Sequence, residues 1–121
     1  MTWIVELADE FEPEFDQLPE IVQDEILAQA RVIERFGPAA KRPRVDTLKG
    51  SRHHNMKELR IAADNGIWRI AFAFDLRRHA VLLVAGDKSG GSEKLFYKTL
   101  IRSADQRFDN HLARLASHKR K

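Results

Sequence analysis

The chain has 121 residues, of which 43% are hydrophobic and 32% charged, and it contains no cysteine. This length and composition fit one soluble globular domain, residues 1–121, and exclude a disordered chain, a disulfide scaffold and a thiolate metal site. No apolar run is long enough to span a bilayer and no secretory signal opens the chain, so a cytoplasmic protein with no membrane partner is expected.

Charge is distributed unevenly along the chain, although the net charge is only +3. Residues 1–40 contain ten acids and two bases, a net charge of −8, and the remaining 81 residues contain 19 bases and eight acids, a net charge of +11. This separation favours a polyanion such as RNA or DNA as a partner. The alternative is that the acidic helices fold back on the basic sheet and neutralise it.

The N-terminal third predicts one strand followed by two helices. Residues 3–7 are rich in β-forming side chains and predict an opening strand that pairs with strands further along the chain. From Asp9 the apolar residues follow helical spacing, first to Pro19 and then to Gly37, so a helical hairpin is expected. Its acidic face is interpreted as a solvated surface, with a basic partner as the alternative.

Three apolar runs predict an antiparallel meander in the middle of the chain. The runs are separated by turn-forming residues and span residues 59–63, 67–74 and 80–85. Asn65-Gly66 predicts a type I′ turn between the first two, because both central residues of such a turn need positive φ. Residues 45–50, before the meander, are expected to form a loop or an edge strand.

The C-terminal segment predicts a glycine-containing loop and a closing helix. Residues 86–92 lack the spacing of a phosphate-binding P-loop, and Ser92 is suited to cap the helix that follows. A helical apolar stripe is expected to pack on a face of the sheet; its members are Phe96, Leu100, Ala104, Phe108, Leu112 and Leu115. Residues 117–121 are expected to be a frayed tail. The fold class is therefore α+β, in the order β-α-α-β-β-β-α, with a small antiparallel sheet packed against an N-terminal helical hairpin and a C-terminal helix.

Two arginines of the meander are expected to lie close together. If the chain turns at Asn65-Gly66, Arg69 lies opposite or diagonal to Arg60 or its neighbour Ala62. Two cations at that separation are unfavourable unless an anion bridges them, which favours a bound phosphate. The alternative is that Glu58 or Asp87 neutralises both arginines.

The residue types near this pair suit phosphate chemistry on RNA. Arginine grips phosphate oxygens with two donors, remains charged, and stabilises negative charge that develops in a transition state. In RNA a 2′-hydroxyl can attack its own adjacent phosphate without a metal or a protein nucleophile, so no cofactor is expected. The adjacent His53 and His54 project to opposite sides of a strand, which argues against a metal site. The candidate catalytic residues are Arg60, Arg69, Lys57, Lys88, His54 and Tyr97.

These features together resemble a known family. The element order, with LKG at 48–50, KELRI at 57–61, WRIAF at 68–72 and VLLVAGDK at 81–88, resembles the RelE/ParE superfamily of toxins, and most closely its phage-derived HigB-like branch. The resemblance implies a RelE-like fold and a toxin of a type II toxin–antitoxin system. Such a toxin is an mRNA interferase, an endoribonuclease that cleaves messenger RNA in the ribosomal decoding site.

The resemblance also implies roles for particular residues. Arg60, Arg69 and Lys88 match the bases of the family, and Tyr97 corresponds to an aromatic hydroxyl near the C-terminus of many relatives. Glu58 stands where some relatives have a second lysine. The contenders for the general base are therefore Lys57, Lys88, His54 and Glu58.

The implied partners are the ribosome with its messenger RNA and a cognate antitoxin, a small helix-turn-helix protein that forms a hetero-oligomer with the toxin. Four further bases are expected to bind RNA: Lys49, Arg52, Lys94 and Lys98. Two other functions remain open on the sequence, because one fold hosts many functions: a ParE-like poison of DNA gyrase and a non-catalytic RNA-binding module.

Overall fold

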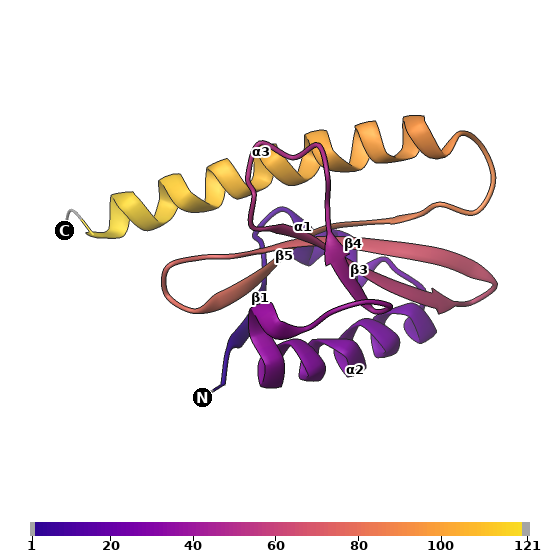
Figure 1. Cartoon of the computed structure of the whole chain (residues 1–121), viewed down its shortest axis with the longest axis horizontal. Helices are drawn as coiled ribbons and strands as arrows, with labels where there is room; N and C mark the ends of the chain where they lie inside the picture. The colour runs from indigo at the N-terminus through magenta and orange to yellow at the C-terminus, as the bar shows by residue number, and fades with distance from the viewer. Residues whose placement is uncertain (1, 120–121) are drawn as a thin grey trace.

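A computed structural model describes residues 2–119 of the chain. Its elements in order are β1 (Ile4–Leu7), α1 (Phe11–Asp16), α2 (Glu20–Phe36), the 3₁₀ turn η1 (Gly37–Ala39), β2 (Val45–Thr47), β3 (Met56–Ala63), β4 (Gly66–Phe74), β5 (His79–Asp87) and α3 (Glu93–Lys119). The five strands form one sheet in the order β1-β5-β4-β3-β2, with α3 on one side and α2 on the other (Figure 1). The predicted α+β fold class is confirmed.

The sheet is mixed, whereas the sequence predicted an antiparallel one. β1 pairs with β5 in parallel, with Val5 opposite Ala80, while the other three pairings are antiparallel. Parallel neighbours need a long crossover between them, and here the rest of the sheet and both N-terminal helices lie between β1 and β5 in the chain. The apolar periodicity of a strand does not reveal whether it pairs in parallel or antiparallel with a strand that is distant in the sequence. The segment predicted as a loop or edge strand contains the edge strand β2.

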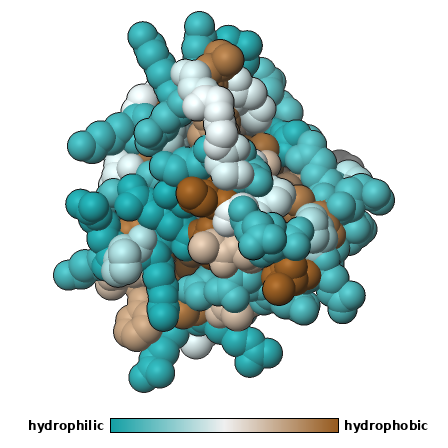
Figure 2. Space-filling model, turned by 90° about the vertical axis from the view of Figure 1, so that its right-hand side faces the viewer, coloured by the Kyte–Doolittle hydropathy of each residue, from teal (hydrophilic) through white to brown (hydrophobic). Residues whose placement is uncertain are grey.

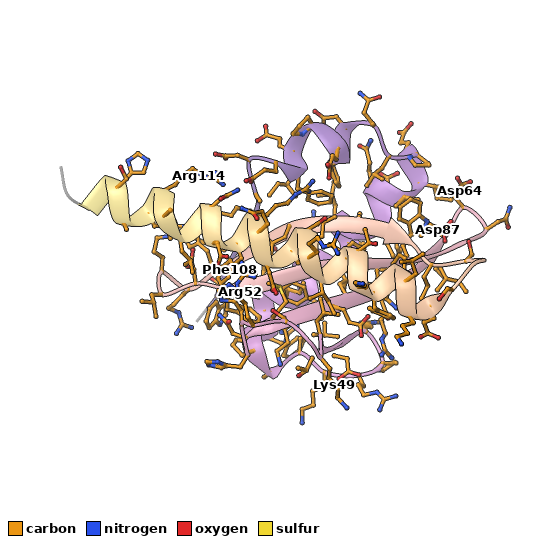
Figure 3. The ribbon with its side chains drawn as sticks, turned by 90° about the horizontal axis from the view of Figure 1, so that it is seen from above. Lys49, Arg52, Asp64, Asp87, Phe108 and Arg114 are labelled. Carbon is orange, nitrogen blue, oxygen red and sulfur yellow. The ribbon has the colours of Figure 1, made fainter. Side chains whose placement is uncertain are left out.

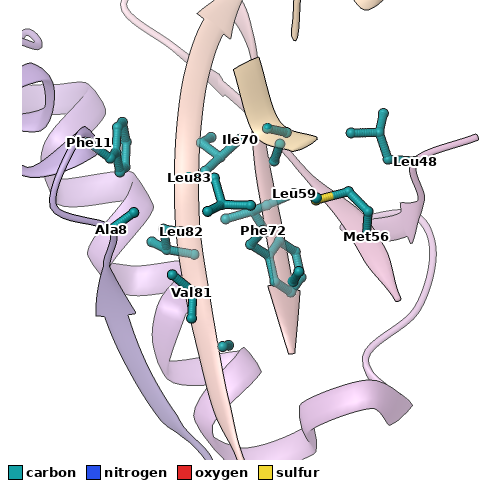
Figure 4. Close-up of a cluster of buried hydrophobic side chains, with 14 of the residues drawn as sticks. Ala8, Phe11, Leu48, Met56, Leu59, Ile70, Phe72, Val81, Leu82 and Leu83 are labelled. Carbon is teal, nitrogen blue, oxygen red and sulfur yellow. The ribbon is translucent and has the colours of Figure 1, made fainter. Parts of the chain in front are cut away.

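Both faces of the central strand β4 are covered. Its residues from Ile70 to Phe74 are all buried, without the alternation expected of a strand with one solvated face. Figure 4 shows Ile70 and Phe72 packed among side chains of neighbouring elements, including Leu59 of β3 and Leu82 of β5. Burying one such side chain contributes about 1.5–3 kcal/mol, so these contacts fix the sheet between its two helical layers.

Helix α3 is longer than the sheet that it covers. Leu100, Ala104 and Phe108 are buried, whereas Leu112 is 36% exposed, and the C-terminal turns extend past the β4–β5 connection (Figure 1). The predicted packing of the apolar stripe is thus confirmed as far as Phe108 and is wrong for Leu112. The helix continues to Lys119, through much of the segment predicted to fray, and residues 120–121 lie outside the described residues.

The turn between β3 and β4 lies one residue earlier than predicted. Its central residues are Asp64 and Asn65, with φ of 51° and 59°, and β4 begins at Gly66. Gly66 is required because of close packing and not because of the turn conformation. A Cβ atom at this position would lie 2.7 Å from Trp68 Nε1 and 2.8 Å from Asp87 Oδ2, which leaves no room for a side chain.

Asp75 fastens the β4–β5 turn at the other end of the meander. Its fully buried carboxylate accepts hydrogen bonds from the backbone N–H groups of Arg77 (2.9 Å) and His79 (3.1 Å) and from the Arg77 guanidinium (2.8 Å). It also lies 3.0 Å from Nε2 of His111 in α3. Burial acts to raise the pKa of Asp75, but hydrogen bonds from His111, Arg77 and the backbone outweigh it and lower the pKa. The carboxylate therefore joins the turn to α3.

Asp75→Asn is expected to lower the free energy of unfolding by about 3 kcal/mol at neutral pH, because it leaves Arg77 and His111 without a buried anion. The folded-state pKa of Asp75 is lowered, so this stabilisation is present above the unfolded-state pKa and is lost as pH falls through the folded-state pKa. Urea denaturation of both proteins at a series of acidic pH values measures this. A difference in stability that does not shrink in acid would contradict the assignment.

The turn position has its own test. Asp64→Val is expected to destabilise the protein by about 1–2 kcal/mol, because a β-branched residue at positive φ is strained, whereas Asp64→Gly is expected to be tolerated. Thermal unfolding of the two variants beside the wild type makes the comparison. Equal stability of Asp64→Val and the wild type would instead place residue 64 in a strand and the turn at Asn65-Gly66.

Candidate functional site

The turn at Asp64-Asn65 sets Arg60 of β3 directly opposite Arg69 of β4. Strand alternation places Glu58 on the same face of β3 as Arg60, and α3 lays Tyr97 over this face. We call Glu58, Arg60, Arg69 and Tyr97 the Glu58 cluster. The sequence predicted that the two arginines converge, and the structure confirms it.

Glu58 is the centre of the cluster, and the residue is only 5% exposed. Its Oε1 accepts a hydrogen bond from the Tyr97 hydroxyl at 2.7 Å and lies 3.4 Å from Arg69 Nε, and its Oε2 lies 3.4 Å from Arg60 Nη2. Arg69 Nε also donates to the Tyr97 hydroxyl at 3.3 Å. A buried carboxylate is costly in free energy unless it is paired with a cation and accepts hydrogen bonds. Here two guanidinium groups pair with Glu58, and the Tyr97 phenol donates a hydrogen bond to it.

The anion between the two arginines is therefore the chain's own. The sequence left two readings open, a bound phosphate or neutralisation by Glu58 or Asp87, and in this structure Glu58 contacts both arginines. Its single charge offsets one of them, and Asp46 also pairs with Arg60. Asp87 is occupied elsewhere, where it accepts hydrogen bonds from the backbone N–H of Ile67 and from the hydroxyl of Ser89. An incoming phosphate must compete with Glu58 at both arginines and with Asp46 at Arg60.

Arg60 has capacity for a further acceptor. Its Nη2 lies 3.3 Å from Oδ2 of Asp46 in β2, while its buried Nε has no hydrogen-bond partner among the described residues. A cavity of about 290 Å³ adjoins it, lined by Asp46, Thr47, Leu48, Lys49, Glu58, Arg60, Glu93 and Tyr97. The cavity combines cationic donors with carboxylate acceptors, as a site that binds a phosphate and moves a proton requires.

Tyr97 is held as a neutral hydrogen-bond donor. Burial and the hydrogen bond to Glu58 raise the pKa of Tyr97, and the opposing effect of Arg69 is smaller. Lys88 reaches the edge of the same cluster, with Nζ 5.6 Å from the centre of the Tyr97 ring and 3.2 Å from Oε1 of Glu93. The structure thus brings four predicted site residues together: Arg60, Arg69, Tyr97 and Lys88.

Two predicted catalytic residues lie apart from the cluster. Lys57 precedes Glu58 in β3 and points to the opposite face, where its Nζ donates to the Thr47 hydroxyl at 3.2 Å. His54 is exposed in the loop between β2 and β3, and no hydrogen bond between described residues joins it to the Glu58 cluster. Neither is positioned by the fold to act on a group that Arg60 and Arg69 hold.

The four basic residues predicted to bind RNA do not all lie free on one surface. Lys49, Lys94 and Lys98 are exposed, and Lys49 lines the cavity beside Arg60. Figure 3 shows Lys49 pointing away from α3, while Arg52 lies close to Phe108 of that helix. The three lysines keep their predicted role as a proposal, whereas Arg52 is engaged within the protein.

Arg52 belongs to a clamp that ties the β2–β3 loop to α3. Its guanidinium pairs with Asp109, and its backbone N–H donates to Asp105 Oδ2 at 3.2 Å. The Ser51 hydroxyl donates to the buried Asp105, and His53 Nε2 lies 2.8 Å from Asp109 Oδ1. The hydrogen bond from Arg52 lowers the pKa of Asp109, against a smaller effect of burial, and His53 adds to the lowering. The clamp helps to hold α3, and with it Tyr97, over the sheet.

Sequence reasoning gave Glu58 only as one of two acids that could neutralise the arginines and as one of four contenders for the general base, and it missed the contribution of Asp46. Alternation does put Glu58 beside Arg60, which was a usable signal. No comparable signal marked Asp46, because its place opposite Glu58 depends on how β2 pairs with β3.

Acidic residues in and just before α1 partly neutralise the basic part of the chain. Arg107 of α3 pairs with Glu14 at 2.7 Å, and Arg114 pairs with Glu10 at 3.1 Å and Asp9 at 3.2 Å. The alternative of fold-back neutralisation is thus correct for these groups. At the end of the molecule that carries the β3–β4 turn, hydrophilic side chains predominate and apolar ones emerge in separate patches (Figure 2).

Within residues 2–119, no three histidine, aspartate or glutamate side chains are grouped as metal ligands would be. None of the helices described there has both the length and the apolar composition needed to cross a bilayer.

Sequence comparison identifies relatives over most of the chain. The family model of phage-derived Gp49-like proteins (DUF891) matches residues 13–109. Two proteins of Mycobacterium tuberculosis (strain ATCC 25618 / H37Rv) assigned as toxins are similar in sequence. HigB2 is 44% identical over 97 aligned residues, which cover 79% of this chain and 48% of HigB2. HigB3 is 49% identical over 82 aligned residues, which cover 68% of this chain and 69% of HigB3. The chain therefore spans about half the length of HigB2.

Two solved structures share the fold. A mutant of the E. coli toxin RelE in the free state superposes with a TM-score of 0.56 at 10% identity, covering 84% of this chain and 95% of that one. A chain of the archaeal RelE–RelB complex from Pyrococcus horikoshii OT3 gives a TM-score of 0.53 at 17% identity, covering 75% and 100%. These likenesses confirm the RelE-like fold that the resemblance implied. With the family model and the HigB sequences in agreement, the chain belongs to the Gp49-like family of phage-derived proteins, and its resemblance to HigB toxins is confirmed.

Proposed function

We propose that this chain is the toxin of a type II toxin–antitoxin module and that it cleaves messenger RNA on the ribosome, in the cytoplasm. The observation that carries the proposal is the pair Arg60 and Arg69, held around one carboxylate beside a cavity. The sequence likeness to HigB2 and HigB3 supports it. The neutralising partner is a cognate antitoxin, as the pairing of RelE with RelB in the archaeal complex suggests.

In the proposed reaction the RNA supplies its own nucleophile. The scissile phosphate binds beside Arg60 and Arg69, whose guanidinium groups stabilise the charge of the pentavalent transition state. Glu58 takes the proton of the 2′-hydroxyl, the 2′-oxygen bonds to phosphorus, and the bond to the 5′-oxygen breaks. The leaving oxygen receives a proton from Lys88, and the products are a 2′,3′-cyclic phosphate and a 5′-hydroxyl. No metal enters this scheme.

Glu58 suits the role of base better than Lys57 or His54 because it alone of the three contacts both arginines. Tyr97 suits a positioning role, because its hydroxyl already donates its hydrogen bond to Oε1 of Glu58. The phenol fixes Oε1 of Glu58 and leaves proton donation to Lys88.

The Tyr97–Glu58 hydrogen bond can be measured directly because Tyr97 is the only tyrosine in the chain. The absorbance change of tyrosine ionisation is expected to have its midpoint above the ordinary value of 10.0. Glu58→Gln should lower this midpoint, because it removes the negative charge that opposes phenol ionisation. Tyr97→Phe, which abolishes the signal, is the control. A wild-type midpoint at or below 10.0 would contradict the buried hydrogen bond from Tyr97 to Glu58.

The activity is tested by incubating the protein with translating ribosomes and mapping the ends of the messenger RNA. Wild-type protein should produce new 5′-hydroxyl ends, and Arg69→Ala should reduce the cleavage rate by about 10²-fold or more, the loss typical of one removed transition-state donor. Arg31→Ala, an exposed arginine on α2, is the matched control and should cleave as the wild type does. Circular dichroism confirms that each variant is folded.

Arg69 is nearly buried against Glu58, so Arg69→Ala also removes a structural contact. Arg60→Ala, at a more exposed position, provides a second variant with the same expected loss. Intact message at a stoichiometric dose of wild-type protein would overturn the proposal, and double-strand DNA breaks after induction would point to a gyrase poison instead. Full cleavage by folded Arg69→Ala would remove this residue from the site.

A further inference from the structure

A second polar cavity adjoins the edge strand β2. Its volume is about 260 Å³, and it is lined by the turn η1, the loop that follows η1, β2 and Lys57 of β3. We call it the Lys57 cavity. It shares Asp46 and Thr47 with the cavity beside Arg60, so the two cavities are neighbours across β2. This strand is only three residues long and has no further strand on its outer side.

Lys57 brings hydrogen-bond donors to this cavity that the protein leaves unused. An ammonium group has three donors, and the only hydrogen bond of Lys57 to another described side chain goes to Thr47 Oγ1, at 3.2 Å. Among residues 2–119 its side chain forms no ion pair with a carboxylate. The sequence predicts a catalytic role for Lys57, but the residue faces away from the Glu58 cluster. Its remaining donors are therefore open to an acceptor on the other face of the sheet.

Cations outnumber acids around the Lys57 cavity. Lys41 and Arg42 line it together with Lys57, and Asp46 is the one carboxylate among the described lining residues. The charge of Asp46 is shared, because its Oδ2 lies 3.3 Å from Arg60 and 3.7 Å from the exposed Arg42. A single exposed lysine is an ordinary solvated group, whereas three cations around one cavity favour a bound anion.

The position of the cavity indicates which anion it binds. Asp46 contacts Arg60 on one side and Arg42 on the other, so the cationic surface continues from the Glu58 cluster to the Lys57 cavity. Lys57 and Arg60 are three residues apart on β3, about 10 Å at the usual rise of a strand. An RNA strand carries a phosphate at every nucleotide, so a strand with one phosphate at Arg60 has others within reach of Lys57. An acidic peptide would also satisfy these cations, but a polyanionic strand accounts for both cavities and for their shared wall.

We propose that the Lys57 cavity binds a phosphate of single-stranded RNA that flanks the scissile phosphate, with Lys57, Lys41 and the Thr47 hydroxyl as donors. The inference rests on the proposed function for the position of the scissile phosphate. The RNA strand passes around the short edge strand β2, with the scissile phosphate at Arg60 and the flanking phosphate on the opposite face. Lys57 then binds the substrate and takes no part in proton transfer.

The test measures binding of the full chain to a short single-stranded RNA whose 2′-hydroxyls are all methylated, so that it cannot be cleaved. Fluorescence anisotropy gives the affinity over a series of salt concentrations. Each phosphate contact on a single strand contributes about 0.7 to the slope of log affinity against log salt. Lys57→Gln should therefore reduce the slope by about 0.7 and weaken binding about fivefold near 0.1 M salt, with the difference vanishing towards about 1 M. Lys41→Gln should behave in the same way.

Three further variants serve as controls. Lys57→Arg keeps the charge and should keep the wild-type slope. Arg31→Gln removes an exposed cation of α2 that lines neither cavity, and it should also keep the wild-type slope. Lys57→Gln combined with Arg60→Gln should reduce the slope by about 1.4, because the two residues bind different phosphates.

A wild-type slope in Lys57→Gln, an equal reduction in Arg31→Gln, or absence of binding by the wild type would overturn the proposal. In the ribosome assay, Lys57→Gln should need about fivefold more protein for half-maximal cleavage and reach the wild-type rate at saturation. A lower saturating rate would overturn it too, because Lys57 would then take part in the chemistry. Failure of the proposed function gives a different result, since a wild type that cleaves no message still reports its salt slope with the methylated RNA.

Discussion

Arg60 and Arg69 face each other across β3 and β4, and the buried carboxylate of Glu58 offsets the repulsion between them. This arrangement depends on the pairing register of the two strands. A shift by one residue would move every side chain of one strand to the other face and would separate the arginines from Glu58. The two-residue turn at Asp64-Asn65 and the close packing around Gly66 hold the register in place.

Helix α3 completes the cluster from above and is fastened at two places. Near its middle, Asp105 and Asp109 hold the β2–β3 loop, and two residues after Asp109, His111 meets the buried Asp75 of the β4–β5 turn. These contacts orient the N-terminal turns of α3, so that Tyr97 reaches Glu58. Buried charged networks cost free energy unless every member is satisfied, and both fastenings meet that requirement with several donors for each carboxylate.

The pairing of Arg60 and Arg69 with a carboxylate of the chain has consequences for the proposed reaction. Arg60 and Arg69 are preorganised by a carboxylate, so they need little rearrangement when a phosphate arrives, although the phosphate must compete with Glu58 for their donors. The same carboxylate is then close to the 2′-hydroxyl that must lose a proton.

The sequence by itself determined the positions and types of the elements, because helical and strand periodicities are local properties of the chain. It also placed Arg60 and Arg69 near one another, since the hairpin is short. Only the tertiary structure decided the one-residue position of the turn, the parallel pairing of β1 with β5, and the engagement of Arg52 with α3. Each of these depends on which distant groups satisfy one another's hydrogen bonds and charges, and that choice is made by the packing of the whole chain.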